Sequence, residues 1–209
     1  VLLGTDVLFE LTLTAIAGNY LAEAKKGYSL QEGVLWHFSL ACAIASNLLA
    51  EELGFKDTQC LYTAALLQEI GKLILDPYLE PDAEKFRALK EEAELNCCEM
   101  EEKLLGLNHA QTGGAVLSHW KLPEKISEAV AWHHDPSQNQ ISQDLSDLIQ
   151  LSDMLVVSLD LEKLNVNACY PLDELKFLDA GIPVERIPEL TATLRERLAA
   201  AESFLDGTG

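Results

Sequence analysis

Residues 106–136 read GLNHAQTGGAVLSHWKLPEKISEAVAWHHDP and hold His109, His133 and His134 within a helical pattern of apolar residues. Neighbouring residues of a regular helix point about 100° apart, so His133 and His134 would diverge there. Pro136 ends the pattern directly after them, which allows both imidazoles to face one site from a frayed helix end. The alternative is that one of the two histidines is buried and the other exposed.

The same helical spacing runs through almost the whole chain, and strand-like alternation is rare. The sequence therefore predicts an all-α fold, a helical bundle with a core over residues 1–160 and a C-terminal helical extension over 161–209 that packs on it. Pro77 is expected to end one helix, and the acidic run 91–102 is interpreted as a solvated helix face. The predicted helices are 5–24, 31–53, 57–76, 82–106, 109–120, 123–134, 144–160, 172–180 and 183–204.

Charge and composition narrow the classes of partner. The 209 residues carry a net charge of −19, which argues against binding to nucleic acid or to an anionic membrane surface. The sequence has no uninterrupted apolar run of the roughly 18 residues that a bilayer requires, and no basic signal-peptide start. Five cysteines, two of them adjacent at Cys97 and Cys98, give no disulfide framework, so we expect a reducing, cytoplasmic setting. The chain opens without Met inside a helical pattern, which favours a larger parent protein.

Histidine and carboxylate side chains at the predicted helices suggest a metal site. Imidazole and carboxylate ligands together suit an Fe, Mn or Zn ion, and helical bundles build such sites from inward side chains of several helices. One or two ions there could lower the pKa of bound water and hold a phosphate during hydrolysis. The candidate ligands are His37, Glu69, His109, His133, His134 and Asp153.

Each candidate also has a simpler interpretation. His37 lies on an apolar face and fits a core or interfacial histidine equally well, and His109 at a helix start fits a capping or surface role. Glu69 could pair with Lys72 on the next turn of a helix. Asp153, in an apolar helix, needs a partner that is either a metal or a salt bridge.

The order of these elements resembles the HD superfamily of metal-dependent phosphohydrolases, and more closely its HDOD branch. The matching blocks are residues 35–54, 64–75, 102–136 and 148–156. HDOD domains are generally regarded as non-catalytic regulatory modules of bacteria, so the resemblance implies an HD-like bundle that acts on signalling proteins of two-component or cyclic-di-nucleotide pathways. Such domains usually carry a further N-terminal helical lobe, and the resemblance implies that this chain starts near the end of that lobe, which would be truncated.

The chain departs from catalytic relatives where a histidine followed by an aspartate would bind the metals. Here the pair reads Gln68-Glu69. The neutral amide of glutamine is a poor ligand for these metals. Glutamate keeps a carboxylate but moves it by one methylene, and displacements of this size typically lower activity by orders of magnitude. The paired histidines continue as HHDPSQNQ, without the Gly-Tyr-Pro motif of the related cyclic-di-nucleotide phosphodiesterases. In an active relative Lys72 would face the phosphate.

Three hypotheses follow. We favour a non-catalytic HDOD-type signalling module with at most a residual metal. The second is a degenerate but active metal-dependent phosphohydrolase, and the third is a scaffolding domain whose histidines are relics. The sequence leaves the partner, the signal, the metal and the oligomeric state open.

Overall fold

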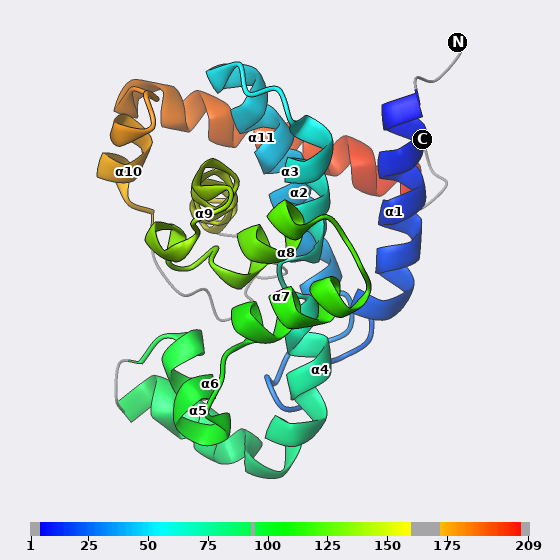
Figure 1. Cartoon of the computed structure of the whole chain (residues 1–209), viewed down its shortest axis with the longest axis vertical. Helices are drawn as coiled ribbons and strands as arrows, with labels where there is room; N and C mark the ends of the chain where they lie inside the picture. Colours follow the sequence, from blue (N-terminus) through cyan, green and yellow to red (C-terminus); the bar gives the residue numbers. More distant parts are fainter. Residues whose placement is uncertain (1–4, 93–94, 160–171, 206–209) are drawn as a thin grey trace.

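The structure is a computed structural model that describes residues 5–92, 95–159 and 172–205. Within these residues it is built from helices, as the sequence predicts (Figure 1). The helices are α1 (Thr5–Leu21), α2 (Val34–Leu53), α3 (Thr58–Leu67), α4 (Ile70–Leu79), α5 (Ala83–Glu92), α6 (Cys97–Leu105), α7 (His109–His119), α8 (Glu124–Ala131), α9 (Gln143–Val157), α10 (Glu174–Asp179) and α11 (Ile187–Leu205). Short 3-10 turns cover Glu80–Asp82, Pro136–Gln138 and Val184–Arg186.

Helix α2 lies at the centre of the bundle. It packs against α3 and α9 and also contacts α1 and α11, because apolar residues cover most of its circumference (Figure 1). By length and mean hydropathy α2 alone among the described helices could cross a membrane, yet 67% of the relevant window is buried inside the fold. That burial is what a helix in the core of a folded domain requires.

Two of the predicted helices are each divided in the structure, so their predicted bounds are wrong. The helix expected over 57–76 breaks at Gln68 and Glu69, so that α3 and α4 are separate, and Pro77 lies inside α4 instead of ending it. The helix expected over 82–106 also divides into α5 and α6. Asn96 starts α6 with a capping box in which its side chain accepts a hydrogen bond from the backbone N–H of Glu99.

Glycine allows α4 and α7 to approach closely. A Cβ atom added at Gly71 would lie 1.9 Å from the backbone oxygen of His109, a distance that no side chain tolerates. Gly114 makes a comparable approach to α8, where an added Cβ would meet Ala131 at 2.6 Å. Gly71 therefore allows the first residue of α7 to lie beside the α3–α4 break, and Gly114 allows α7 to pack closely on α8.

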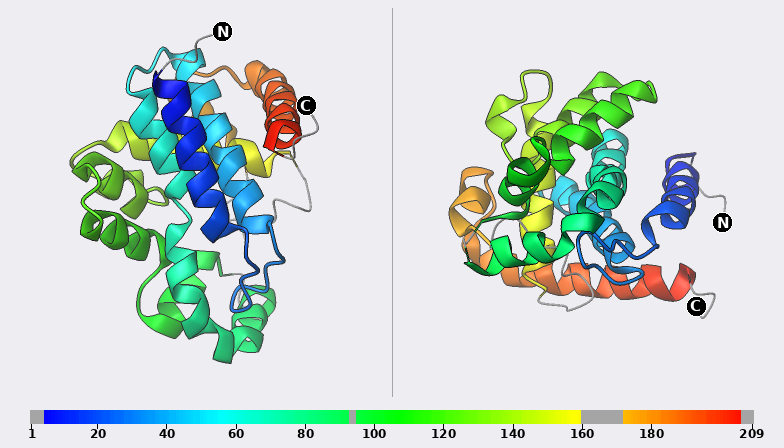
Figure 2. Two further views of the ribbon diagram at one scale, coloured as in Figure 1. Left: turned by 90° about the vertical axis from the view of Figure 1, so that its right-hand side faces the viewer. Right: turned by 90° about the horizontal axis from the view of Figure 1, so that it is seen from below.

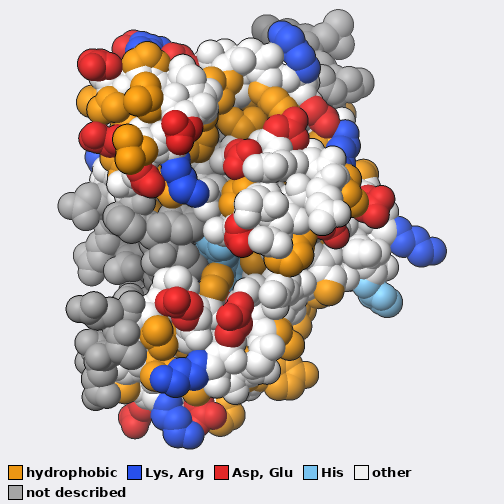
Figure 3. Space-filling view, turned by 60° about the vertical axis from the view of Figure 1, so that its left-hand side comes forward, with side chains coloured by type: hydrophobic (Ala, Val, Ile, Leu, Met, Phe, Trp, Pro, Cys, Tyr) orange, Lys and Arg blue, Asp and Glu red, His pale blue; other side chains and the backbone are white. Residues whose placement is uncertain are grey.

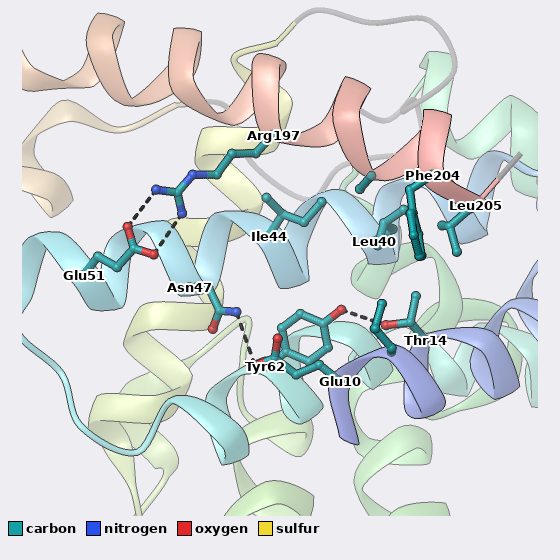
Figure 4. A pocket seen from close by; sticks show the side chains of 12 residues that line it. Glu10, Thr14, Leu40, Ile44, Asn47, Glu51, Tyr62, Arg197, Phe204 and Leu205 are labelled. Carbon is teal, nitrogen blue, oxygen red and sulfur yellow. Dashed lines mark hydrogen bonds and ion pairs between the residues drawn. The ribbon is translucent and has the colours of Figure 1, made fainter. Parts of the chain in front are cut away.

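Helix α11 spans the breadth of the molecule and packs on α2 and α9 (Figure 2). It is fastened at the surface by Arg197, which donates two hydrogen bonds to Glu51. A cavity of about 330 Å³ lies between α1, α2, α3 and α11, with this ion pair at one end and hydrogen-bonded Thr14 and Tyr62 in its wall (Figure 4). The predicted boundary between core and extension, at residues 160 and 161, falls outside the described residues and stays a prediction.

Candidate metal centre

Five of the six predicted ligands come together where α4, α7, α8 and α9 meet. One group of ligand atoms, all within 4.8 Å of one another, belongs to Glu69, His109 and His133. A second such group belongs to His133, His134 and Asp153. The break before α4, the start of α7, the end of α8 and the middle of α9 each supply part of the cluster.

The structure does not bring His37 to this cluster. Its Nδ1 lies 3.1 Å from Oε1 of Glu202 on α11. No candidate metal group among the described residues includes His37. The side chain therefore has the interfacial role that was the simpler interpretation of its sequence.

His109 is completely buried and is oriented by Glu101. The Glu101 carboxylate lies 2.8 and 3.0 Å from Nδ1 of His109 and accepts a hydrogen bond of 2.6 Å from its backbone N–H. The imidazole and Lys72 hold the pKa of Glu101 below its usual value, although burial alone would raise it. A histidine that binds a metal through one ring nitrogen typically has its other ring nitrogen hydrogen-bonded to a carboxylate, which orients the ring.

The neighbouring histidines at the end of α8 do face one site, as Pro136 allows. Their ring centroids lie 3.9 Å apart, with the ring planes tilted by 42° to each other. Nδ1 of buried His133 lies 2.7 Å from the carbonyl oxygen of Val130, which leaves Nε2 as its nitrogen for coordination. His134 is partly exposed, and its Nε2 lies 2.9 Å from Nε2 of His109.

The two carboxylates of the cluster are already bonded from within the protein. Lys72 Nζ lies 2.6 Å from Oε2 of Glu69, and both side chains are buried. Oδ1 of Asp153 accepts hydrogen bonds from Gln68, at 2.6 Å, and from the thiol of Cys42, at 3.2 Å. Burial and the nearby Glu69 raise the pKa of Asp153 to about 6. The pairing of Glu69 with Lys72, which was the simpler interpretation of Glu69, is thus present.

Sequence reasoning missed part of the site. Glu101, interpreted as part of a solvated face, is fully buried, where it accepts hydrogen bonds from Tyr28, at 2.8 Å, and from Cys97. Cys98 was also missed, and its Sγ lies 3.9 Å from Nδ1 of His109. The only available signal was spacing, because Glu101 and Cys98 stand three residues apart on the same helix.

Comparison with known proteins decides the family. The family model described as HDOD domain matches residues 1–136, well over half of the chain. The chain belongs to the HDOD domain family. No curated protein sequence matches it significantly.

Three solved structures share the fold of this HDOD domain. A protein from Marinobacter aquaeolei VT8, provisionally named a signal transduction protein, is 18% identical with a TM-score of 0.72; the match covers 97% of this chain and 45% of that one. An HDOD domain protein of unknown function from Geobacter sulfurreducens is 22% identical with a TM-score of 0.70, covering 98% and 69%. A protein from Shewanella amazonensis SB2B, provisionally named a phosphohydrolase, is 18% identical with a TM-score of 0.72, covering 92% and 70%.

The cluster retains donors for a metal ion, but its two carboxylates no longer suit a pair of ions. Oriented imidazoles of His109 and His133, with partly exposed His134 beside them, are suitable ligands. Gln68 and Lys72 instead place an amide donor and an ammonium against the carboxylates that would neutralise a second ion. Figure 3 shows histidine side-chain atoms at the bottom of a surface hollow, with acidic side chains around it.

Proposed function

We propose that this domain is a non-catalytic HDOD-type regulatory module that acts in the cytoplasm through contacts with other proteins. The proposal rests on one observation: the carboxylates of Asp153 and Glu69 are both bonded to other side chains of the protein. Gln68, which stands where catalytic relatives have a histidine, donates to Asp153, and Lys72 forms an ion pair with Glu69. The dyad is therefore replaced by internal bonds that hold the site together.

Electrostatics explain why this replacement opposes hydrolysis. Two-metal hydrolysis needs anionic ligands that bring two divalent cations together and hold the attacking and leaving oxygens. A buried ammonium beside Glu69 contributes positive charge in the place where those cations would need negative charge. The Lys72 side chain is also committed to Glu69, which removes the phosphate-facing role it would have in an active relative.

Signalling proteins of two-component or cyclic-di-nucleotide pathways are the proposed partners. Family membership supports this class, and the Marinobacter aquaeolei protein of similar fold is provisionally named a signal transduction protein. The chain spans less than half of that protein, so a partner could contact regions outside this domain. The net charge of −19 disfavours nucleic acid and anionic membranes as partners.

A phosphodiester hydrolysis assay tests the proposal. The protein would be purified without chelator and incubated with nucleotide and model phosphodiester substrates in the presence of Mn, Fe or Mg. We expect no turnover above that of the His109→Ala variant at equal concentration. Turnover that His109→Ala abolishes would contradict the proposal.

The second candidate function is a degenerate but active phosphohydrolase. The survival of His109, His133, His134 and Asp153 in one cluster favours it. In that case metal-bound water would attack phosphorus, and Asp153→Ala would remove activity. The same hydrolysis assay separates the two candidates, because only the second gives turnover that depends on Asp153.

A further inference from the structure

We propose that the cavity between α1, α2, α3 and α11 binds a small amphipathic amine, with its apolar body against α2 and α11 and its ammonium group at Asn47 and Glu10. The cavity measures about 330 Å³, within the range of pockets that hold small molecules. Two features of its wall support the proposal: a change from apolar to polar side chains along its length, and a buried amide oxygen. Of the described residues that line it, none is a candidate metal ligand, so the cavity is separate from the metal cluster.

The wall of the cavity changes from apolar to polar along α2 (Figure 4). On this helix the cavity is lined by Leu40, Ile44, Asn47 and Glu51. Residues at this spacing share one face of a helix, and at a rise of about 1.5 Å per residue they extend over about 16 Å. A ligand that lies along this face therefore meets apolar side chains at one end and polar side chains at the other.

Helix α11 shows the same change along a second wall. At the polar end Arg197 donates two hydrogen bonds to Glu51. Towards the apolar end α11 lines the cavity with Ala201, Phe204 and Leu205 (Figure 4). Phe204 is 65% exposed and Leu205 is 42% exposed. An apolar ligand body that covers these two side chains removes their surface from water, which favours binding.

A buried amide oxygen belongs to the polar part of the wall. Nδ2 of Asn47 donates a hydrogen bond of 3.4 Å to Oε1 of Glu10 on α1. Because an ionised carboxylate only accepts hydrogen bonds, this contact orients the amide and leaves Oδ1 as the atom that needs a donor. Oδ1 is buried, and no donor among the described residues reaches it. Since an unpaired buried acceptor is costly, a ligand that donates to Oδ1 supplies a hydrogen bond that the fold does not.

The charge of the wall favours an ammonium group over an anion. Its charged side chains are those of Glu10, Glu51 and Arg197, and two carboxylates with one guanidinium give a net charge of −1. Both Arg197 hydrogen bonds go to the carboxylate of Glu51, so the guanidinium is already compensated. An ammonium group beside Asn47 gains a neutral acceptor and lies near the carboxylate of Glu10, whereas an anionic group there would be repelled.

A ligand in the cavity contacts the first and the last of the described helices. Both α1 and α11 pack on α2. Helix α3 contributes Tyr62, whose hydroxyl group lies 2.7 Å from that of Thr14 on α1. A molecule that contacts all four helices binds only while they are packed together, so its binding stabilises this packing. We therefore expect the amine to strengthen the attachment of α1 and α11 to α2.

Three probes that share one apolar body and differ in their polar group test the proposal. Phenylbutylamine, phenylbutanol and phenylbutyrate would be titrated into the whole chain at neutral pH by isothermal titration calorimetry. We expect one amine per chain, bound at least about 10-fold more tightly than the alcohol or the carboxylate, because hydrogen bonds that involve a charged group are the stronger ones. The side-chain amide signals of Asn47 in nuclear magnetic resonance spectra should shift with the same affinity.

Matched variants locate the binding site. Ala201→Phe fills the cavity and should weaken binding of the amine by about 10-fold or more. Ala200→Phe adds the same side chain at the exposed neighbouring residue, which does not line the cavity, and should leave the affinity unchanged. Glu10→Gln removes one negative charge and should reduce the affinity for the amine towards that for the alcohol, whose own affinity should stay constant.

Each variant would first be matched to the wild type by circular dichroism. Absence of binding for all three probes would overturn the proposal, and so would equal affinity for the amine and the alcohol or tighter binding of the carboxylate. These three results need only the wild-type chain, so the test does not depend on the folding of a variant. Binding of the amine that persists unchanged in a folded Ala201→Phe protein would also overturn the proposal, because it would place the ligand elsewhere.

Discussion

The buried cluster around His109 and the surface ion pairs of α11 both contain charged side chains, but they differ in their exposure to solvent. In the cluster, Glu69 and Lys72 pair with almost no exposure to solvent. On the surface, Arg197 and Glu51 form a bidentate pair in which both side chains are well exposed (Figure 4). Arg197 holds the pKa of Glu51 below its usual value, but solvent screens the interaction.

The two regions differ in what compensates a charge that loses its partner. Surface pairs fasten α11 to α2 and tolerate change, because water replaces a lost partner. In the cluster no water replaces a lost partner, so every charge needs a bonding group supplied by the fold. Gln68 and Lys72 fill that requirement for Asp153 and Glu69, and the same groups oppose a pair of metal ions.

The largest effect is expected from Lys72→Met. It removes the ammonium 2.6 Å from Glu69 and leaves a buried carboxylate uncompensated, so the free energy of unfolding should fall by about 3–5 kcal/mol. Urea unfolding at neutral pH measures the change. The double variant Lys72→Met, Glu69→Gln is the control and should recover most of the loss, since no buried charge is left alone. A near-wild-type midpoint for Lys72→Met would show that the pair is not a structural element.

The pH dependence of stability sharpens the comparison for Asp153. Its folded pKa of about 6 is above its ordinary value of 3.8, so the folded protein binds this proton more tightly. The resulting stability is fully present below about pH 4 and is lost as pH rises through about 6. A difference of about two pKa units corresponds to about 3 kcal/mol.

Comparison with Asp153→Asn isolates this contribution from other carboxylates. The wild type should lose about 3 kcal/mol relative to the variant between about pH 4 and pH 7, measured by urea unfolding at several pH values. For an exposed pair such as Arg197–Glu51 the stability should change with pH in the opposite direction. The pKa of Glu51 is lowered in the folded protein, so its contribution to stability is present at higher pH and is lost as pH falls. A gap between wild type and variant that stays constant with pH would exclude a raised pKa at Asp153.

Gln68→Leu should have a smaller effect. The variant removes the donor 2.6 Å from Asp153 but leaves the Cys42 thiol in place, so we expect a loss of about 1–3 kcal/mol in the free energy of unfolding. Chemical denaturation at neutral pH provides the measurement. Equal or greater stability than the wild type would mean that the amide does not support the carboxylate.

The smallest effect is expected at the surface. Arg197→Ala breaks the pair with Glu51 and should change the free energy of unfolding by less than about 1 kcal/mol, with a further decrease of the effect in high salt. The same urea unfolding, repeated at low and high ionic strength, checks both statements. A loss as large as that of Lys72→Met would remove the distinction between the two regions.

Much of the fold was predictable because helical periodicity is a local signal. The histidines at 109, 133 and 134 were also recognisable, since their spacing and Pro136 are visible in the sequence. Glu101 was not, because the acidic run around it has the composition of a solvated face. In the structure Glu101 lies on α6, which is separate from α5, and its carboxylate contacts His109, a tertiary contact that composition does not predict.

The position of His37 away from the cluster was hidden for the converse reason. Its apolar helical face predicted an inward side chain, but packing of α11 places Glu202 beside it. The break between α3 and α4 was equally hidden, because Gln68 and Glu69 have no turn-forming character in the sequence. Directly after the break Gly71 approaches His109 closely, a contact between segments far apart in the chain.

Metal stoichiometry tests the central claim most directly. The protein would be purified without chelator or His-tag, loaded separately with Mn, Fe and Zn, desalted, and analysed by inductively coupled plasma mass spectrometry. Because Gln68 donates a hydrogen bond to Asp153 and Lys72 forms an ion pair with Glu69, the account predicts no more than one ion of any of these metals per chain. Two iron or manganese ions per chain would contradict it, since they would show that an intact two-metal centre survives the change to Gln68-Glu69.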